Sequence, residues 1–235
     1  MLGLTEERMI VNRDPYLRAV DGIVFGNNPR QGFMEGRRFY HPELQFQVDF
    51  APGWRVDNTT EAVFAMEPQE AAQLDLTVAK VPPGTTAAAY VRALASRGLT
   101  PQAVQDIRIH GYNAVLATYV FRAQQGGTLA AVAGFIEYRD QIFQIVGVTS
   151  DFERFRGAIE ESIRSFDRIT DQRVLRAQPD RLKIYTVQQG DTLTAIAGRN
   201  NNPRVTADDL AILNRLAIDQ PIAPGRLVKI VEKGY

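Results

Sequence analysis

The chain has 235 residues, of which 45% are hydrophobic, so it is long enough for one medium-sized domain and one small domain, each with its own core. Its 27 Lys and Arg residues balance 27 Asp and Glu residues, which argues against a nucleic-acid-binding protein, because such proteins carry a clustered basic excess. The absence of cysteine excludes disulfide bonds and thiolate chemistry, and no apolar run is long enough to predict a transmembrane segment.

The amino-terminal part, residues 1–37, predicts a short helix followed by a connecting segment. Asp14 and Pro15 supply a helix N-cap and a first-turn proline, and the apolar residues that follow recur at helical spacing up to Gly26. Residues 1–8 contain neither the apolar core nor the cleavage site of a signal peptide. We therefore expect that the chain is a piece of a longer exported protein, or that a signal peptide was removed from it.

Residues 38–168 predict an α+β domain in which an antiparallel sheet is flanked by helices. Two helices are expected: one begins at Thr85 or Thr86 and ends at Gly98, and the other begins at Ser150 and Asp151. The apolar stripe of the second helix is typical of a helix that faces a core. The expected strands are 44–50, one opening at Trp54, 62–66, 74–81, 112–122, 128–139 and 141–149, the last three in meander order.

Residues 169–182 predict a solvated linker, because basic residues such as Arg173 and Arg176 alternate there with Asp171 and Asp180. The last part, residues 183–235, predicts two helices packed on a two-stranded sheet. Its elements are a strand around Tyr185 and Val187, a turn at Gly190 with Asp191 as helix N-cap, a helix carrying Leu193 and Ile196, a second helix capped by Thr206, and a strand at 227–231.

The motif residues of this last part recur in one known family. They are Tyr185-Thr186-Val187, Gly190-Asp191-Thr192-Leu193, Ile196-Ala197, Asn214, Pro224-Gly225 and Val228-Lys229-Ile230. Together they resemble a LysM domain, a small βααβ fold that binds glycans containing N-acetylglucosamine, most often peptidoglycan. The resemblance implies that the chain works at or near a cell wall.

In LysM domains the glycan lies in a shallow groove between the loop after the first strand and the loop before the last one. The resemblance therefore places the glycan-binding residues at Gly190, Asp191, Thr192, Leu193, Asn214, Leu216, Ile218 and Ile222. Backbone groups would pair with the N-acetyl group, and Leu193, Leu216 and Ile218 would pack on the sugar face. The chain departs from the family in a polar insertion at 200–205 and in the lack of an aromatic residue in the groove, so a docking domain without glycan affinity stays open as an alternative.

A second resemblance covers the first 55 residues. It rests on Arg13-Asp14-Pro15-Tyr16-Leu17, Gln31-Gly32-Phe33, Phe39-Tyr40-His41-Pro42-Glu43-Leu44 and Ala51-Pro52-Gly53-Trp54. These segments are similar to the region downstream of the catalytic domain in bacterial zinc metallopeptidases of the CAAX-prenyl-protease type, in their BepA-like branch. The domain that follows resembles the PsbP/Mog1-like fold. The chain would then be the non-catalytic end of such a peptidase, contacting a protease domain or another envelope protein.

The zinc chemistry of those peptidases is not predicted for this chain. They hold zinc with an H-E-x-x-H helix, whereas the two histidines here, His41 and His110, lie far apart in sequence, each without a partner four residues away. We expect no metal and no cofactor in this chain, and zinc only in a catalytic domain that precedes it. None of the serines lies in a G-x-S-x-G elbow.

Two further sites stay open as weaker alternatives. A carboxylate pair for glycoside cleavage could form from residues distant in sequence, although Glu67, Glu70 and the pair Glu160-Glu161 are predicted as ordinary surface residues. Trp54 and His41 could line a pocket near the start of the sheet. The sequence favours a non-enzymatic binding protein of the cell envelope or periplasm, in which the last domain binds glycan and the larger one contacts a protein partner.

Overall fold

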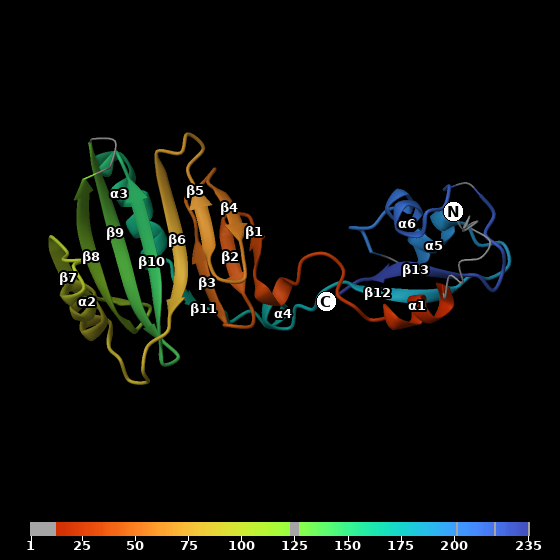
Figure 1. Cartoon of the computed structure of the whole chain (residues 1–235), viewed down its shortest axis with the longest axis horizontal. Coiled ribbons are helices and arrows are strands. Elements are labelled where there is room, and N and C mark those ends of the chain that lie inside the picture. Colours follow the sequence, from red (N-terminus) through yellow and green to blue (C-terminus); the bar gives the residue numbers. More distant parts are fainter. Residues whose placement is uncertain (1–12, 123–126, 201, 219, 235) are drawn as a thin grey trace, which may run out of the picture. The chain divides into compact units, whose positions relative to one another are not determined.

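A computed structural model describes residues 13–122, 127–200, 202–218 and 220–234 (Figure 1). The described residues divide into two compact units: the large unit lies within residues 31–175, and the small unit lies within residues 13–30 and 176–234. Residues 1–8, where the sequence shows no signal peptide, lie outside the described residues. Among the described helices, none combines the length and the apolar character that a membrane span requires.

The large unit is built on a seven-stranded antiparallel sheet with the strand order β4-β5-β6-β10-β9-β8-β7. Its strands are β4 (Arg55–Asn58), β5 (Val63–Met66), β6 (Ala72–Ala79), β7 (Ala103–Ile109), β8 (Tyr112–Arg122), β9 (Thr128–Tyr138) and β10 (Gln141–Thr149). The strands β8, β9 and β10 are consecutive neighbours, so the predicted meander is confirmed. The predicted α+β class, an antiparallel sheet flanked by helices, is confirmed as well.

Two helices cover opposite faces of this sheet, α2 (Ala87–Ser96) and α3 (Phe152–Arg164). Helix α2 packs Val91 into an apolar cluster on one face, and α3 packs Ile159 and Ile163 into the main core on the other. Gly134 and Gly147 lie directly under α3, where a Cβ atom on either glycine would collide with an isoleucine of the helix. The glycines therefore set how closely the helix approaches the sheet.

A second, four-stranded sheet lies on the same core as α3, with the order β1-β2-β3-β11. Its strands are β1 (Phe33–Glu35), β2 (Arg38–His41), β3 (Phe46–Asp49) and β11 (Asp167–Arg168). Phe166 joins the layers, because its ring lies 5.5 Å from that of Phe46 and 5.1 Å from that of Phe143. The main core of the large unit is thus a layer of aromatic and aliphatic side chains. On one side of this layer lies the seven-stranded sheet, and on the other side lie α3 and the small sheet.

Several local predictions differ from the structure. The strand β7 and the separate small sheet were not predicted, because β7 is mostly exposed and the strands of the small sheet are short. Helix α3 begins after Asp151, whose side chain caps it, rather than with a cap at Ser150. Of the two caps predicted for α2, Thr86 is the one that caps the helix, so this prediction is confirmed. Helix α1 (Arg13–Ala19) ends well before the expected Gly26.

The small unit pairs two strands and packs two helices on them. Its elements are β12 (Arg181–Thr186), α5 (Leu193–Asn200), α6 (Ala207–Asn214) and β13 (Leu227–Glu232), in the predicted βααβ order. The N-cap of α6 is Thr206, as predicted, and it forms a capping box with Asp209. Within the expected polar insertion, Asn202 and Val205 are buried.

Residues 13–30 pack in the small unit, although the sequence treated residues 1–37 as a separate segment. Main-chain hydrogen bonds run between Gly22 and Leu182 (2.7 Å) and between Leu182 and Ile23 (2.9 Å), and the Asp21 carboxylate accepts the N–H of Ile184. Leu17 of α1 is buried. The segment thereby covers the free edge of β12. Residues 172–175 of the expected linker form a short helix, α4 (Gln172–Leu175).

Candidate functional site

The two loops that the sequence predicted to form a groove meet at one end of the small unit. Because β12 and β13 are antiparallel, with Thr186 paired to Leu227, the loop after β12 and the loop before β13 leave the sheet at the same end. Hydrogen bonds of 2.9 Å continue this pairing from Val187 to Arg226 and Gly225. We refer to residues 187–192, 215–218 and 220–226 as the loop pair.

The predicted glycan-binding residues fall into exposed and buried groups. Gly190 is exposed and has φ +83°, a conformation that suits glycine, while Thr192, Leu216 and Ile218 are half-buried. Leu193 is fully buried and Ile222 nearly so, both in the core of the small unit. The prediction that Leu193 packs on a sugar face is therefore corrected: its side chain fills the interior, because the first position of α5 faces the sheet.

Asp191 stabilises the first loop rather than capping α5. Its carboxylate accepts the N–H of Gln188 and the hydroxyl of Tyr185, both at 2.8 Å, and it also pairs with Arg199. The helix is capped instead by Thr192, whose hydroxyl accepts the N–H of Ala195. The Gln188 N–H, with the help of Tyr185 and Arg199, holds the pKa of Asp191 below its usual range, against the opposing effect of burial.

Asn214 joins α6 to β13. Its side-chain NH₂ donates to the carbonyl oxygens of Leu210 (2.9 Å) and Lys229 (2.8 Å), and its Oδ1 accepts the N–H of Lys229 at 2.8 Å. These bonds occupy both donors of the amide and one acceptor site. Asn214 thus holds the second loop of the pair in place, and only the loop residues beyond it offer free surface.

The exposed part of the loop pair combines apolar residues, amides and two arginines, Arg215 and Arg226. Ala217, Pro221 and Ala223 are exposed next to the half-buried Ile218, and Gln188 and Gln189 are exposed on the first loop. The sequence did not single out these two glutamines, although two adjacent amides in a turn after a strand are a signal that could have been read. The surface combines apolar contact area with amide donors and acceptors, which is the chemistry that an N-acetylated sugar requires.

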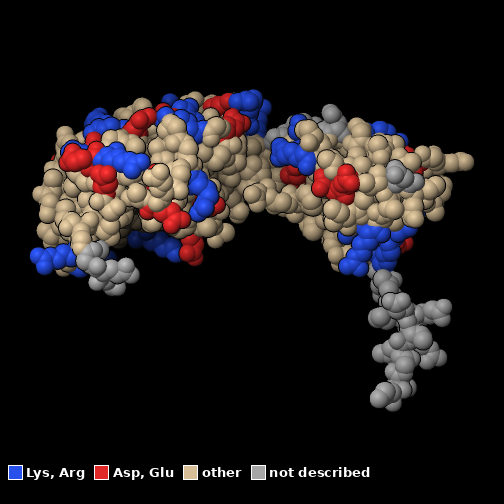
Figure 2. Space-filling view, turned by 90° about the horizontal axis from the view of Figure 1, so that it is seen from above, with Lys and Arg blue, Asp and Glu red and all other residues tan. Residues whose placement is uncertain are grey.

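Charges of both signs are mixed on the surface. On the face drawn in Figure 2, basic and acidic side chains are interspersed over the large unit. Ion pairs such as Arg37 with Glu161 and Arg156 with Glu160 contribute to this mixture. The described residues on this face of the large unit therefore give no extended field of one sign.

Three of the carboxylates considered for glycoside cleavage, Glu67, Glu160 and Glu161, have hydrogen-bond or ion-pair partners of their own. Glu67 is buried, contrary to the surface position predicted for it, because its carboxylate accepts the N–H groups of Gln69 (2.9 Å) and Ala71 (3.2 Å) in the β5–β6 turn. Glu160 and Glu161 lie on α3 and pair with arginines. Within the described residues, no group of three or more His, Cys, Asp or Glu side chains could hold a metal ion.

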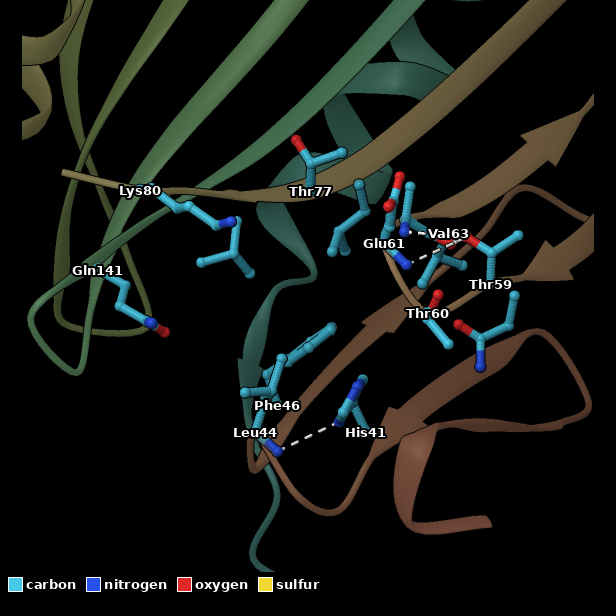
Figure 3. A pocket seen from close by; sticks show the side chains of 14 residues that line it. His41, Leu44, Phe46, Thr59, Thr60, Glu61, Val63, Thr77, Lys80 and Gln141 are labelled. Carbon is cyan, nitrogen blue, oxygen red and sulfur yellow. Dashed lines mark hydrogen bonds between the residues drawn. The ribbon is translucent and has the colours of Figure 1, made fainter. Parts of the chain in front are cut away.

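The large unit has a pocket of its own, and His41 lies in its wall (Figure 3). Its volume is about 540 Å³, and it opens between the end of the small sheet and strands β5 and β6. From the sequence, His41 and Trp54 were expected as possible neighbours in such a pocket. Trp54 does not line it, because its ring packs edge-on against Phe155 at 6.4 Å.

Residues 185–231 match the LysM domain family. LysM domains bind glycans that contain N-acetylglucosamine, such as peptidoglycan, and occur in proteins associated with the cell envelope. The predicted LysM domain is thereby confirmed. No curated protein sequence matches the chain.

Several solved structures resemble the chain at low sequence identity. A protein from Bacteroides thetaiotaomicron has 12% identity and a TM-score of 0.44, over 66% of this chain and 55% of its own. The cyanobacterial PsbP of Synechocystis has 10% identity and a TM-score of 0.44, over 56% and 91%. The Ran-binding protein Mog1p of Saccharomyces cerevisiae has 10% identity and a TM-score of 0.41, over 60% and 99%.

Proposed function

We propose that this chain is a non-catalytic binding protein of the cell envelope, whose LysM domain binds peptidoglycan or another N-acetylglucosamine glycan at the loop pair. The observation that carries the proposal is the convergence of the two loops at one end of the sheet within the matched residues 185–231. The exposed apolar residues of the loop pair suit the face of a pyranose ring, and its main-chain and glutamine amides suit the acetamido group.

The bonds of Asp191 and Asn214 support this assignment. Asp191 ties the first loop to Tyr185 and Arg199, and Asn214 ties the second loop to β13, so both walls are held before a ligand arrives. A site that is already ordered loses less conformational entropy on binding. The sequence of the loop pair contains no aromatic residue to stack on the sugar, so we expect weak binding by one domain and stronger retention on a polymeric wall.

The experiment is co-sedimentation of the full chain with insoluble peptidoglycan, comparing Ile218→Asp with Ile212→Asp. Ile218 lies in the loop pair, whereas Ile212 is 77% exposed on α6, outside both loops. A charge at position 218 should weaken binding about fivefold, since it removes roughly 1 kcal/mol of apolar contact. The control variant should sediment like the unaltered chain. Circular dichroism checks that both variants are folded.

A soluble ligand pair tests the chemistry of recognition. A tetramer of N-acetylglucosamine should shift backbone amide resonances of the loop pair, and a glucose tetramer without acetamido groups should not. If neither glycan nor peptidoglycan binds, the LysM domain acts as a docking domain. Equal binding of the two tetramers would contradict the role of the amides.

We further propose that the large unit contacts a protein partner, and that the chain works in the periplasm as the non-catalytic end of a zinc metallopeptidase. The support is the resemblance of Arg13-Asp14-Pro15-Tyr16-Leu17 and Phe39-Tyr40-His41-Pro42-Glu43-Leu44 to the region after the catalytic domain of such enzymes. In this proposal the zinc belongs to a preceding domain, and this chain holds no cofactor. A gene that encodes H-E-x-x-H upstream in the same reading frame would support it. Proteolytic activity of the chain by itself would overturn it.

A further inference from the structure

The pocket of the large unit lies at the open end of the layer between its two sheets (Figure 3). Its walls come from the β2–β3 end of the small sheet, the β4–β5 loop, strand β6 and the start of β10. Its volume of about 540 Å³ lies within the range of small-molecule sites, roughly 300–1,000 Å³. Every residue of the pocket belongs to the large unit, so its occupant does not depend on the glycan proposal.

The floor of the pocket is the end of the main core. Phe46, Val63 and Leu76 line it and belong to the buried cluster of the large unit, and Leu44 and Val78 are half-buried beside them. These side chains come from both sheets, and it is the half-buried Leu44 and Val78 that keep apolar surface exposed in the pocket. A ligand with an apolar body would cover surface that the protein itself leaves partly open to water.

One wall of the pocket is held by local hydrogen bonds. The hydroxyl of Thr59 donates to the carbonyl oxygen of Ala62 (2.9 Å) and accepts the N–H groups of Glu61 and Ala62. Asn58 donates to the main chain of Gln31 at 2.9 Å. The β4–β5 loop is therefore shaped before a ligand binds, and Glu61 projects from this ordered turn.

The rim carries charges of opposite sign on opposite sides. Figure 3 shows Lys80 extending from the end of β6 and Glu61 on the β4–β5 loop across the floor. Among the described residues, neither side chain has an oppositely charged partner within 4.0 Å. A ligand between them meets a cation at one end and an anion at the other.

His41 adds one uncharged donor to the pocket wall, on the side of the small sheet. Its Nδ1 accepts the N–H of Leu44 at 3.2 Å, and its ring stacks on Phe46 at 5.3 Å, so the ring orientation is set. Burial lowers the pKa of His41, which keeps the imidazole neutral at pH 7. With Nδ1 as acceptor, the proton is on Nε2, and Nε2–H can donate to a carbonyl oxygen.

We propose that this pocket binds a short apolar peptide with free termini. The peptide carboxylate pairs with Lys80, its ammonium group pairs with Glu61, its main-chain carbonyl accepts Nε2–H of His41, and its side chains cover the apolar floor. An aliphatic carboxylate would satisfy Lys80 and leave Glu61 facing an apolar chain. A polyanion such as a nucleotide would be repelled by Glu61.

The test is a nuclear magnetic resonance titration of the full chain with the dipeptide Leu-Leu, followed through backbone amides of residues 58–63 and 76–80. Leu-Leu should shift these resonances in a saturable way. Gly-Gly should not, because it lacks the apolar body. N-acetyl-Leu-Leu-amide should bind several-fold more weakly, because it keeps the side chains and loses both charges. Shifts elsewhere, or none, would overturn the proposal, and octanoate binding as tightly as Leu-Leu would show a carboxylate site instead.

Three variants locate the contacts. Lys80→Gln and Glu61→Gln should each weaken Leu-Leu binding about two- to fivefold, the range of exposed ion pairs, and they should leave binding of the doubly blocked peptide unchanged. Thr60→Trp places a large side chain at the mouth and should weaken binding about tenfold or more. Thr60 is exposed at the rim, so this variant should stay folded. Lys183→Gln, in the small unit, is the control, and an equal loss in it would contradict the assignment.

Discussion

The two units of the chain are stabilised by different means. In the large unit two apolar clusters fill both faces of a seven-stranded sheet, and side chains such as Phe166 and Ile163 are fully buried. The small unit has a single small core and adds polar side chains that bind the main chain, among them Asn214, Asn202 and Asp191.

The difference follows from size. A small unit buries a lower fraction of its surface than a large one, so apolar burial alone stabilises it less. Hydrogen bonds from polar side chains to the main chain then hold more of the small unit's loops and strands in place. Removing one partner of such a bond leaves a buried polar group unsatisfied. In the large unit, the substitutions that lower stability most should therefore be those that remove buried apolar volume. In the small unit, substitutions that remove a hydrogen bond between a polar side chain and the main chain should matter as well.

The largest effect is expected for Phe166→Ala in the large unit. The ring of Phe166 contacts Phe46, Phe143, Tyr112 and Tyr138, so its loss leaves a cavity between the layers and should lower the free energy of unfolding by about 3–5 kcal/mol. Urea unfolding followed by fluorescence measures it. Phe64→Ala, at a ring that is 40% exposed, is the control, and a comparable loss there would show that burial does not set the difference.

The next effect tests whether the amino-terminal segment stabilises the small unit. Leu17→Ala removes a buried side chain of α1 and should destabilise the unit by about 2–4 kcal/mol, provided that α1 belongs to its core. Hydrogen exchange of β12 and β13 amides reports the loss. Tyr16→Ala alters a neighbouring side chain that is 59% exposed and should leave exchange unchanged. Equal protection of these amides in the two variants would show that the amino-terminal segment does not stabilise the small unit.

A third effect depends on pH. Because the pKa of Asp191 is held below its ordinary 3.8 in the folded state, its contribution to stability is present above pH 3.8 and is lost as the pH falls through the folded value. Asp191→Asn should lower the melting temperature of the small unit at neutral pH and flatten this acid dependence. Melting curves between pH 2 and pH 7 measure both. Glu232→Gln, at an exposed carboxylate, should keep the slope of the unaltered chain.

The smallest effect is expected for Arg38→Gln in the large unit. Arg38 binds Asp49 through two hydrogen bonds, of 2.5 and 2.9 Å, but its side chain is 43% exposed. Its loss should cost about 1 kcal/mol or less, and the difference should shrink in 1 M salt. Arg55→Gln, at a side chain that is 72% exposed, gives the baseline. If Arg38→Gln lowered the free energy of unfolding as much as Phe166→Ala, apolar burial would not be the main source of stability in this unit.

Local signals predicted those elements whose cause is local. The Thr206 cap, the meander of β8, β9 and β10, and the βααβ order of the small unit follow from caps, turns and periodicity over short spans. Strand β7 escaped prediction, because an exposed edge strand has little apolar alternation. The small sheet escaped it because its last strand has only two residues and forms by pairing with β3.

The candidate site was predicted in part. The two loop segments could be located from the LysM motif, and the antiparallel pairing of β12 and β13 brings them together. Which of their side chains point outward could not be read from the motif. Leu193 and Ile222 are apolar residues in the right segments, yet both face the core, and Asn214 is occupied by the main chain of Lys229.

The sequence by itself determined the class of each unit and the position of the LysM motif, because periodicity, caps and turn residues act within a few positions of one another. Only the tertiary structure decided that residues 13–30 join the small unit and that Glu67 is buried. It alone also placed Lys80, Glu61 and His41 around one pocket. These features depend on contacts between residues far apart in the chain, and burial and pairing of that kind leave no local periodic signal.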